Sequence, residues 1–205
     1  MKNIIVLITI FVFNFLFSQD SITDYYNEIA AHSEYSTDGV TSFTPKKWKT
    51  DIKIFVKGYD SIACSELIKV VSELNELIDS IEINIVDNES ESNLIAFFGW
   101  FLDYDKLEPL AEPYTGSNHG LACLYPGTND DFIKGSIYVD VVRCGWFPTE
   151  QSVILKKHLV REELTQALGL LNDSMKYPDS IFYEGSSHPI KFSELDVKII
   201  KMHYN

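Results

Sequence analysis

The sequence is poor in basic residues. Its 17 lysines and arginines stand against 30 aspartates and glutamates, which gives a formal net charge of −13. So acidic a surface repels a phosphate backbone, which disfavours nucleic acid as a partner, and we expect none. The apolar content of 45% is ordinary, and 205 residues are enough for one domain with a hydrophobic core.

Cysteine is also scarce, and occurs only at Cys64, Cys123 and Cys144. An odd number permits at most one internal disulfide, and no CxxC or Cys/His spacing suggests a structural zinc site. Cys123 and Cys144 fall near two strands that are expected to pair, but off-register for a hairpin centred near Asp131. The sequence therefore leaves a bond between these two cysteines open.

The apolar run at the N-terminus, from Ile4 to Phe17, is too short for an ordinary membrane span. It follows a single lysine and precedes small polar residues, which is typical of a secretory signal peptide over residues 1–18. We therefore expect export to the periplasm or the cell exterior, without stable membrane insertion of the mature chain. An uncleaved N-terminal anchor is the alternative.

Beyond an N-terminal extension (19–46), hydrophobic patterns predict a single α/β (α+β) domain over 47–205. Strands are expected over 51–58, 81–86, 93–98, 120–125 and 135–142, and helices over 64–80, 152–170 and 193–204. A strand–helix–strand start favours a parallel core with a right-handed crossover. The turn PGTNDD predicts that 120–125 is one antiparallel edge strand. The expected architecture is a mixed, twisted sheet of five strands.

The segment REELTQALGLLND (161–173) has the outline of a zinc-peptidase helix without its histidines. Zinc peptidases place HExxH on a helix so that two imidazoles bind one metal, and the longer form HExxHxxGxxH turns at its glycine to add a third. In this chain the general base matches at Glu163 and the glycine at Gly169, which a left-handed helix end also explains. The three ligand positions hold Glu162, Gln166 and Asn172.

Three further stretches strengthen this likeness. QALGL (166–170) resembles the sequence after the second ligand in matrixins, and FSELDVKIIKMHY (192–204) resembles their closing helix. DSIFYE (179–184) resembles their Met-turn, with Phe182 in the methionine position. The chain also resembles a family of exported bacterial proteins of unknown function that share the EELTQALGL run. The resemblance implies a metzincin-like fold with an active-site-type helix and a C-terminal helix.

The chemistry of the substituted positions disfavours zinc, because zinc prefers thiolate, imidazole and carboxylate ligands over neutral amides. Without a bound metal, water keeps its ordinary pKa and Glu163 has nothing activated to deprotonate. We expect no cofactor, with zinc or calcium as alternatives; calcium suits oxygen ligands better, and Asp173 could add a fourth. The simplest interpretation places Glu162 and Gln166 on a solvated face, and His158 on the surface.

We therefore expect a non-catalytic pseudo-peptidase that binds an extended polypeptide. The alternatives are a metallopeptidase-like hydrolase with an unusual Glu/Gln/Asn site and a structural role in the envelope. An edge strand beside a cleft takes up peptides by strand addition, and a proline at position 121 should remove a backbone donor from it. The aromatic insertion (99–118) either walls this cleft or folds over the edge and closes it. The expected binding edge consists of Gly120, Leu121, Ala122, Cys123 and Leu124.

Overall fold

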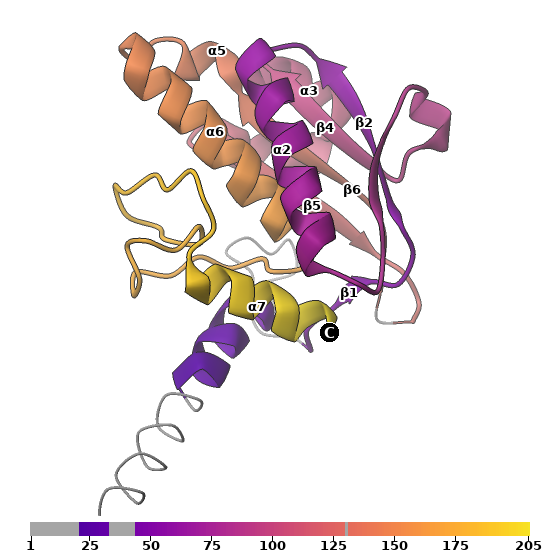
Figure 1. Ribbon diagram of the computed structural model, residues 1–205. Helices are drawn as coiled ribbons and strands as arrows, with labels where there is room; N and C mark the ends of the chain where they lie inside the picture. The colour runs from indigo at the N-terminus through magenta and orange to yellow at the C-terminus, as the bar shows by residue number, and fades with distance from the viewer. Residues whose placement is uncertain (1–20, 33–43, 130) are drawn as a thin grey trace, which may run out of the picture.

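A computed structural model describes residues 21–32, 44–129 and 131–205 (Figure 1). The expected signal peptide (1–18) lies outside these residues. Across the described ranges, no helix has both the length and the apolar character needed to cross a bilayer.

One mixed sheet organises the fold, with the strand order β1-β6-β4-β2-β3 and with β5 paired to β6. Its strands are β1 (Lys47–Trp48), β2 (Ile52–Gly58), β3 (Ile83–Val86), β4 (Leu94–Gly99), β5 (Gly120–Pro126) and β6 (Asp131–Asp140). All pairs are parallel except β5 with β6. The fold class and the antiparallel edge strand are confirmed, but the expected number of five strands was wrong, because the two-residue β1 is too short to leave a pattern.

The helices surround this sheet. They are α2 (Ser61–Leu77), α3 (Phe101–Leu107), α4 (Glu112–Thr115), α5 (Val141–Cys144), α6 (Thr149–Gln166) and α7 (Glu194–Tyr204), with short 3-10 turns at Glu89–Glu91 and Pro109–Ala111. The α2 helix begins earlier than expected, because Asp60 caps it by accepting hydrogen bonds from two backbone N–H groups. The α7 helix begins with the predicted capping box of Ser193 and Asp196.

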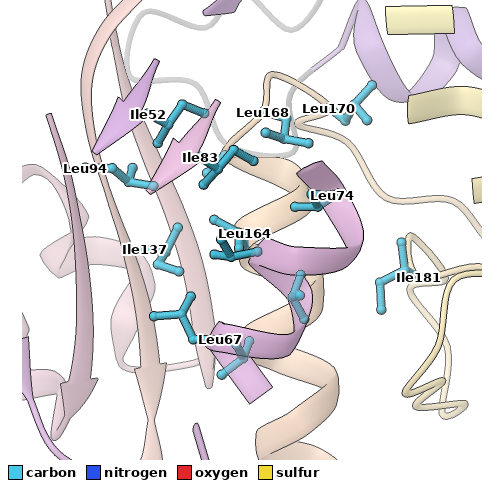
Figure 2. Close-up of a cluster of buried hydrophobic side chains, with 14 of the residues drawn as sticks. Ile52, Leu67, Leu74, Ile83, Leu94, Ile137, Leu164, Leu168, Leu170 and Ile181 are labelled. Carbon is cyan, nitrogen blue, oxygen red and sulfur yellow. The ribbon is translucent and has the colours of Figure 1, made fainter. Parts of the chain in front are cut away.

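The main core lies between one face of the sheet and the pair α2 and α6, which run side by side across it (Figure 1). Figure 2 shows how leucines of the two helices meet isoleucines and a leucine of the strands. These side chains are buried, and removing their apolar surface from water is the main stabilising contribution. They include Ile52, Ile83, Leu94 and Ile137 from the sheet, Leu67 and Leu74 from α2, and Leu164 from α6.

The expected N-terminal extension contributes to the same core. Residues 21–30 are helical, and Tyr25 and Ile29 are buried within it. The Tyr25 hydroxyl lies 3.0 Å from Ser180 Oγ. This helix therefore packs as part of the fold.

The aromatic insertion covers the second face of the sheet. The ring of Tyr104 in α3 stacks on Tyr138 of β6 at a centroid distance of 4.7 Å, in a cluster that also contains Leu121 of β5. Neighbouring residues such as Ile137 point to the main core, as the alternation of a strand requires. The insertion thus packs on the second face of the sheet, behind β5. Among the residues that the structure describes, it does not fold over the outer edge of that strand.

Arg143 holds the end of this insertion against β6. Its guanidinium donates to the carbonyls of Thr115 at 2.7 Å and Gly116 at 2.8 Å, and also to that of Asn118. Its Nε donates to the buried carboxylate of Asp140 at 2.6 Å. The chain that leads into β5 is therefore fixed by a buried ion pair.

Gly169 follows α6 with a φ of +111°, in the region that favours glycine. A Cβ there would overlap the Lys46 carbonyl oxygen and lie 2.9 Å from His203 Nε2. We predict that Gly169→Ala lowers the free energy of unfolding by about 1–3 kcal/mol, because it adds both backbone strain and a clash. Gly116→Ala is the control, since no atom lies within 4 Å of its added Cβ. Equal shifts of the two variants in urea unfolding would contradict this prediction.

Candidate functional site

A cavity of about 340 Å³ lies between α6 and the first residues of β5. The strand contributes Gly120, Leu121 and Ala122, and the segment before it contributes His119. The loop after α6 forms the other wall, which includes His188. The cavity therefore brings together three segments that are far apart in the sequence.

One face of α6 supplies the polar floor. His158, Glu162 and Gln166 follow one another at helical spacing of four residues, and Glu163 lies beside them. His158 is 3% exposed and Glu163 is 4% exposed, while Glu162 and Gln166 are each 9% exposed. The expectation of a surface histidine and a solvated face was wrong, because β5 and the later loop cover this side of the helix.

The His158 ring is oriented by a backbone carbonyl. Its Nδ1 lies 2.9 Å from the carbonyl oxygen of Pro189, and since a carbonyl only accepts, Nδ1 carries the hydrogen. Its Nε2 lies 3.4 Å from Oε2 of Glu162. Burial lowers the pKa of His158 to about 4, so at neutral pH Nε2 presents a lone pair toward a carboxylate. The His188 ring stands 5.0 Å from that of His158, and burial lowers its pKa too.

Glu163 reaches the edge strand because residue 120 is glycine. A Cβ on Gly120 would overlap Glu163 Oε1 and lie 2.9 Å from its Cδ. The residue in the general-base position is therefore packed against the backbone of β5, at the cavity wall.

The three ligand positions do not fit a zinc centre. Gln166 Nε2 donates to Asp173 Oδ1 at 2.9 Å, so its amide nitrogen faces that carboxylate. Asn172 does not line the cavity; its Nδ2 donates to the Asp173 carbonyl at 2.8 Å and its backbone N–H to that of Ile29. Among the described residues, no group of three or more His, Cys, Asp or Glu side chains is arranged to hold a metal ion. Glu162, Gln166 and Asn172 thus do not converge as three ligands would.

The hydrogen-bond phase of β5 decides which backbone groups face outward. Asp140 N–H donates to the His119 carbonyl at 2.7 Å, so the antiparallel ladder turns the backbone groups of Leu121 and Cys123 toward β6. Those of the alternate residues point away from β6, past the edge of the sheet, and within the described residues β5 pairs only with β6. The Leu121 N–H faces β6, so the expectation that a proline at position 121 would remove a donor from the outer edge was wrong. The outward-facing residues are Gly120, Ala122 and Leu124.

Cys123 contributes its side chain to the second face of the sheet, among the aromatic residues of the insertion. All three cysteines, Cys64, Cys123 and Cys144, are free thiols. The disulfide between Cys123 and Cys144 that the sequence left open does not form.

The segment that resembles a Met-turn, DSIFYE (179–184), is fixed by a buried carboxylate. Phe182 is fully buried, and the Asp196 carboxylate accepts hydrogen bonds from Ser180 Oγ at 2.6 Å and from the backbone N–H of Ile181 at 3.1 Å. This anchors the loop that carries Tyr183 to the cavity.

Sequence reasoning missed His119 and His188 as cavity residues. Both lie in irregular segments, and no spacing relates them to α6. It also missed Asp140 and Arg143, whose separation of three residues is the only local signal of their ion pair.

The contact between Glu163 and Gly120 gives a double-mutant test. We predict that Gly120→Ala lowers the free energy of unfolding by about 1–3 kcal/mol, because the methyl group overpacks the buried carboxylate. In the Glu163→Ala background the same change should cost less, with a coupling of about 1 kcal/mol. Urea unfolding of the four proteins measures this coupling, and strictly additive effects would show that the two residues do not touch.

Comparison with solved structures shows what the fold resembles. The crystal structure of myroilysin matches with a TM-score of 0.50 and 14% identity, covering 87% of this chain and 92% of that one. Archaemetzincin from Methanopyrus kandleri matches with a TM-score of 0.45 and 11% identity, over 75% of this chain and 95% of that one. At such identity the myroilysin match shows the fold alone, and it agrees with the metzincin-like fold expected from the sequence. No curated protein matches.

The family comparison covers most of the chain. The model described as "Protein of unknown function (DUF2927)" matches residues 19–205, which include every element of the cavity. The chain belongs to the DUF2927 family.

Proposed function

We propose that this protein is an exported, non-catalytic pseudo-peptidase that binds an extended polypeptide along β5. The observation that carries the proposal is the outward direction of the backbone groups of Gly120, Ala122 and Leu124 beside the cavity. An unpaired strand edge offers alternating donors and acceptors to an added strand. The expected signal peptide (1–18) is the basis for export to the periplasm or the cell exterior.

The geometry next to β5 supports strand addition in several ways. The insertion packs behind β5 and Arg143 fixes the chain leading into it, so the edge is held in place before a partner arrives. Binding to a pre-formed edge avoids the entropic cost of ordering it. Alternate side chains of an added strand would point toward α6 and the cavity.

The residues of α6 support a non-catalytic function. Hydrolysis by a metal-activated water needs convergent ligands, and Glu162, Gln166 and Asn172 do not converge. Glu163 packs against Gly120, and an unactivated water gives it no proton to remove at neutral pH.

A metallopeptidase-like hydrolase remains the alternative function. It is favoured by the position of Glu163 at the cavity wall beside an edge strand, where a general base would meet a bound peptide. In that case Glu162, Gln166 and Asn172 would have to rearrange around zinc or calcium.

A proline variant tests the edge. Peptides selected from a displayed random dodecapeptide library serve as probes. We predict that Ala122→Pro weakens their binding about tenfold or more, because it removes an outward N–H while sparing the β5–β6 ladder. Ile85→Pro is the matched control, since β3 forms the opposite edge of the sheet and residue 85 also faces outward there. If Ala122→Pro binds the peptides as tightly as the parent, β5 is not the binding edge.

A metal and activity assay separates the two functions. We predict that the purified protein retains no equivalent of zinc after dialysis and cleaves neither casein nor mixed peptides, with or without added zinc, because the ligand positions do not converge. Cleavage that is abolished by Glu163→Gln but kept by Glu76→Gln would establish the hydrolase instead. Glu76 is the control because it is an exposed carboxylate on α2 outside the cavity.

A further inference from the structure

The cavity combines negative charge with a lack of cationic lining residues. Its lining includes four carboxylates, and none of its lining residues, all within the described part of the chain, is a lysine or arginine. The carboxylates are Glu162, Glu163, Asp173 and Glu184. Charges of one sign in a confined space favour a ligand of the opposite sign.

Two buried arginines act on histidines of the cavity, and both are paired with carboxylates. Arg143 and Arg161 act electrostatically on His119 and His158. Arg143 is paired with Asp140 at 2.6 Å, however, and the buried Arg161 guanidinium is paired with Glu66 at 2.7 Å and also with a second carboxylate of α2. The negative charge of the cavity is therefore not balanced by these arginines.

The polar floor also presents acceptors that face one another. His158 is 3% exposed, its Nδ1 hydrogen is donated to Pro189, and its Nε2 lies 3.4 Å from Glu162 Oε2. His188 adds a buried Nδ1 that makes no hydrogen bond to a described residue. A ligand with several N–H donors would satisfy this arrangement, and an ammonium or guanidinium group carries three to five of them.

The walls of the cavity suit the rest of a long basic side chain. Leu155, Leu159 and Leu171 line it alongside the carboxylates. A volume of about 340 Å³ is far larger than one ion needs. Lysine and arginine combine an apolar stem with a charged end, and they bury the stem when the end finds a partner.

We propose that the cavity is a specificity pocket for a lysine or arginine side chain of the bound polypeptide, held at the carboxylate of Glu162. This inference rests on the proposed function, because strand addition along β5 is what directs an alternate side chain of the partner toward α6.

The test uses peptides selected from the displayed library, resynthesised in matched forms. In the neutral forms norleucine replaces lysine and citrulline replaces arginine, so that the stem is kept and the charge is removed. For the parent protein, the neutral form should bind about tenfold more weakly or worse, since a charge-assisted hydrogen bond is lost in a buried site. Comparing the lysine and arginine series shows which of the two the cavity prefers.

Protein variants locate this effect in the cavity. Glu162→Gln should reduce the difference between the charged and neutral forms to less than about threefold, while Glu76→Gln, which changes the net charge equally, should preserve it. Unchanged binding of the neutral peptide by Glu162→Gln shows that the variant is folded.

The outcomes for the edge and for the pocket are separable. In one outcome, the selected peptides lose affinity with Ala122→Pro and yet contain no basic residue, or keep their affinity when norleucine or citrulline replaces it. Either result would contradict the pocket and leave the edge-strand site intact. Peptides whose affinity requires a basic side chain and Glu162, but is unchanged by Ala122→Pro, would support the pocket and contradict the edge-strand site. A stoichiometric divalent metal bound at Glu162, with no preference for basic peptides, would also overturn the pocket.

Discussion

The packing of α6 is the constraint on which the rest of the site depends. One side of the helix buries Leu164 against the sheet, and another places Arg161, fully buried, against the carboxylates of α2. A buried guanidinium without its partners costs several kcal/mol, so this pairing leaves little freedom for the helix to rotate. With two sides fixed in this way, the remaining side, which carries His158 and Glu162, must face β5. The site is thus set by interactions that lie outside it.

Glycine at two positions then determines how closely α6 and the turn after it approach their neighbours. At Gly120 the missing side chain admits the Glu163 carboxylate to the edge strand, and at Gly169 it admits the Lys46 carbonyl and allows the chain to reverse after α6. A larger residue at position 120 would push α6 away from β5, and one at position 169 would push the turn after α6 away from the segment before β1. The glycine in the metzincin-like pattern therefore has a structural reason that is independent of any metal, which explains how it is compatible with substituted ligand positions.

The sequence predicted best where one local pattern decides the structure. The β2 and β4 strands and the Ser193 cap of α7 follow from apolar periodicity and capping chemistry. It failed where the decisive partner is distant. His158 looked exposed because the segment that covers it, around Pro189, is 31 residues away. The direction of the Leu121 N–H likewise depends on the phase of the ladder with β6, which strand alternation alone does not define.

The cleft differs from a three-histidine zinc centre in its electrostatics as well as in its chemistry. Three histidines on a metal form a centre of positive charge, which polarises a peptide carbonyl. In this chain the same face of the helix carries two adjacent carboxylates, beside histidines that burial keeps neutral near pH 7. The edge strand β5 lies beside these carboxylates, where the potential has the opposite sign to that of such a centre. In the proposed function, such a cleft would select a partner by the positive charge that the partner brings, and salt would weaken that contact by screening it.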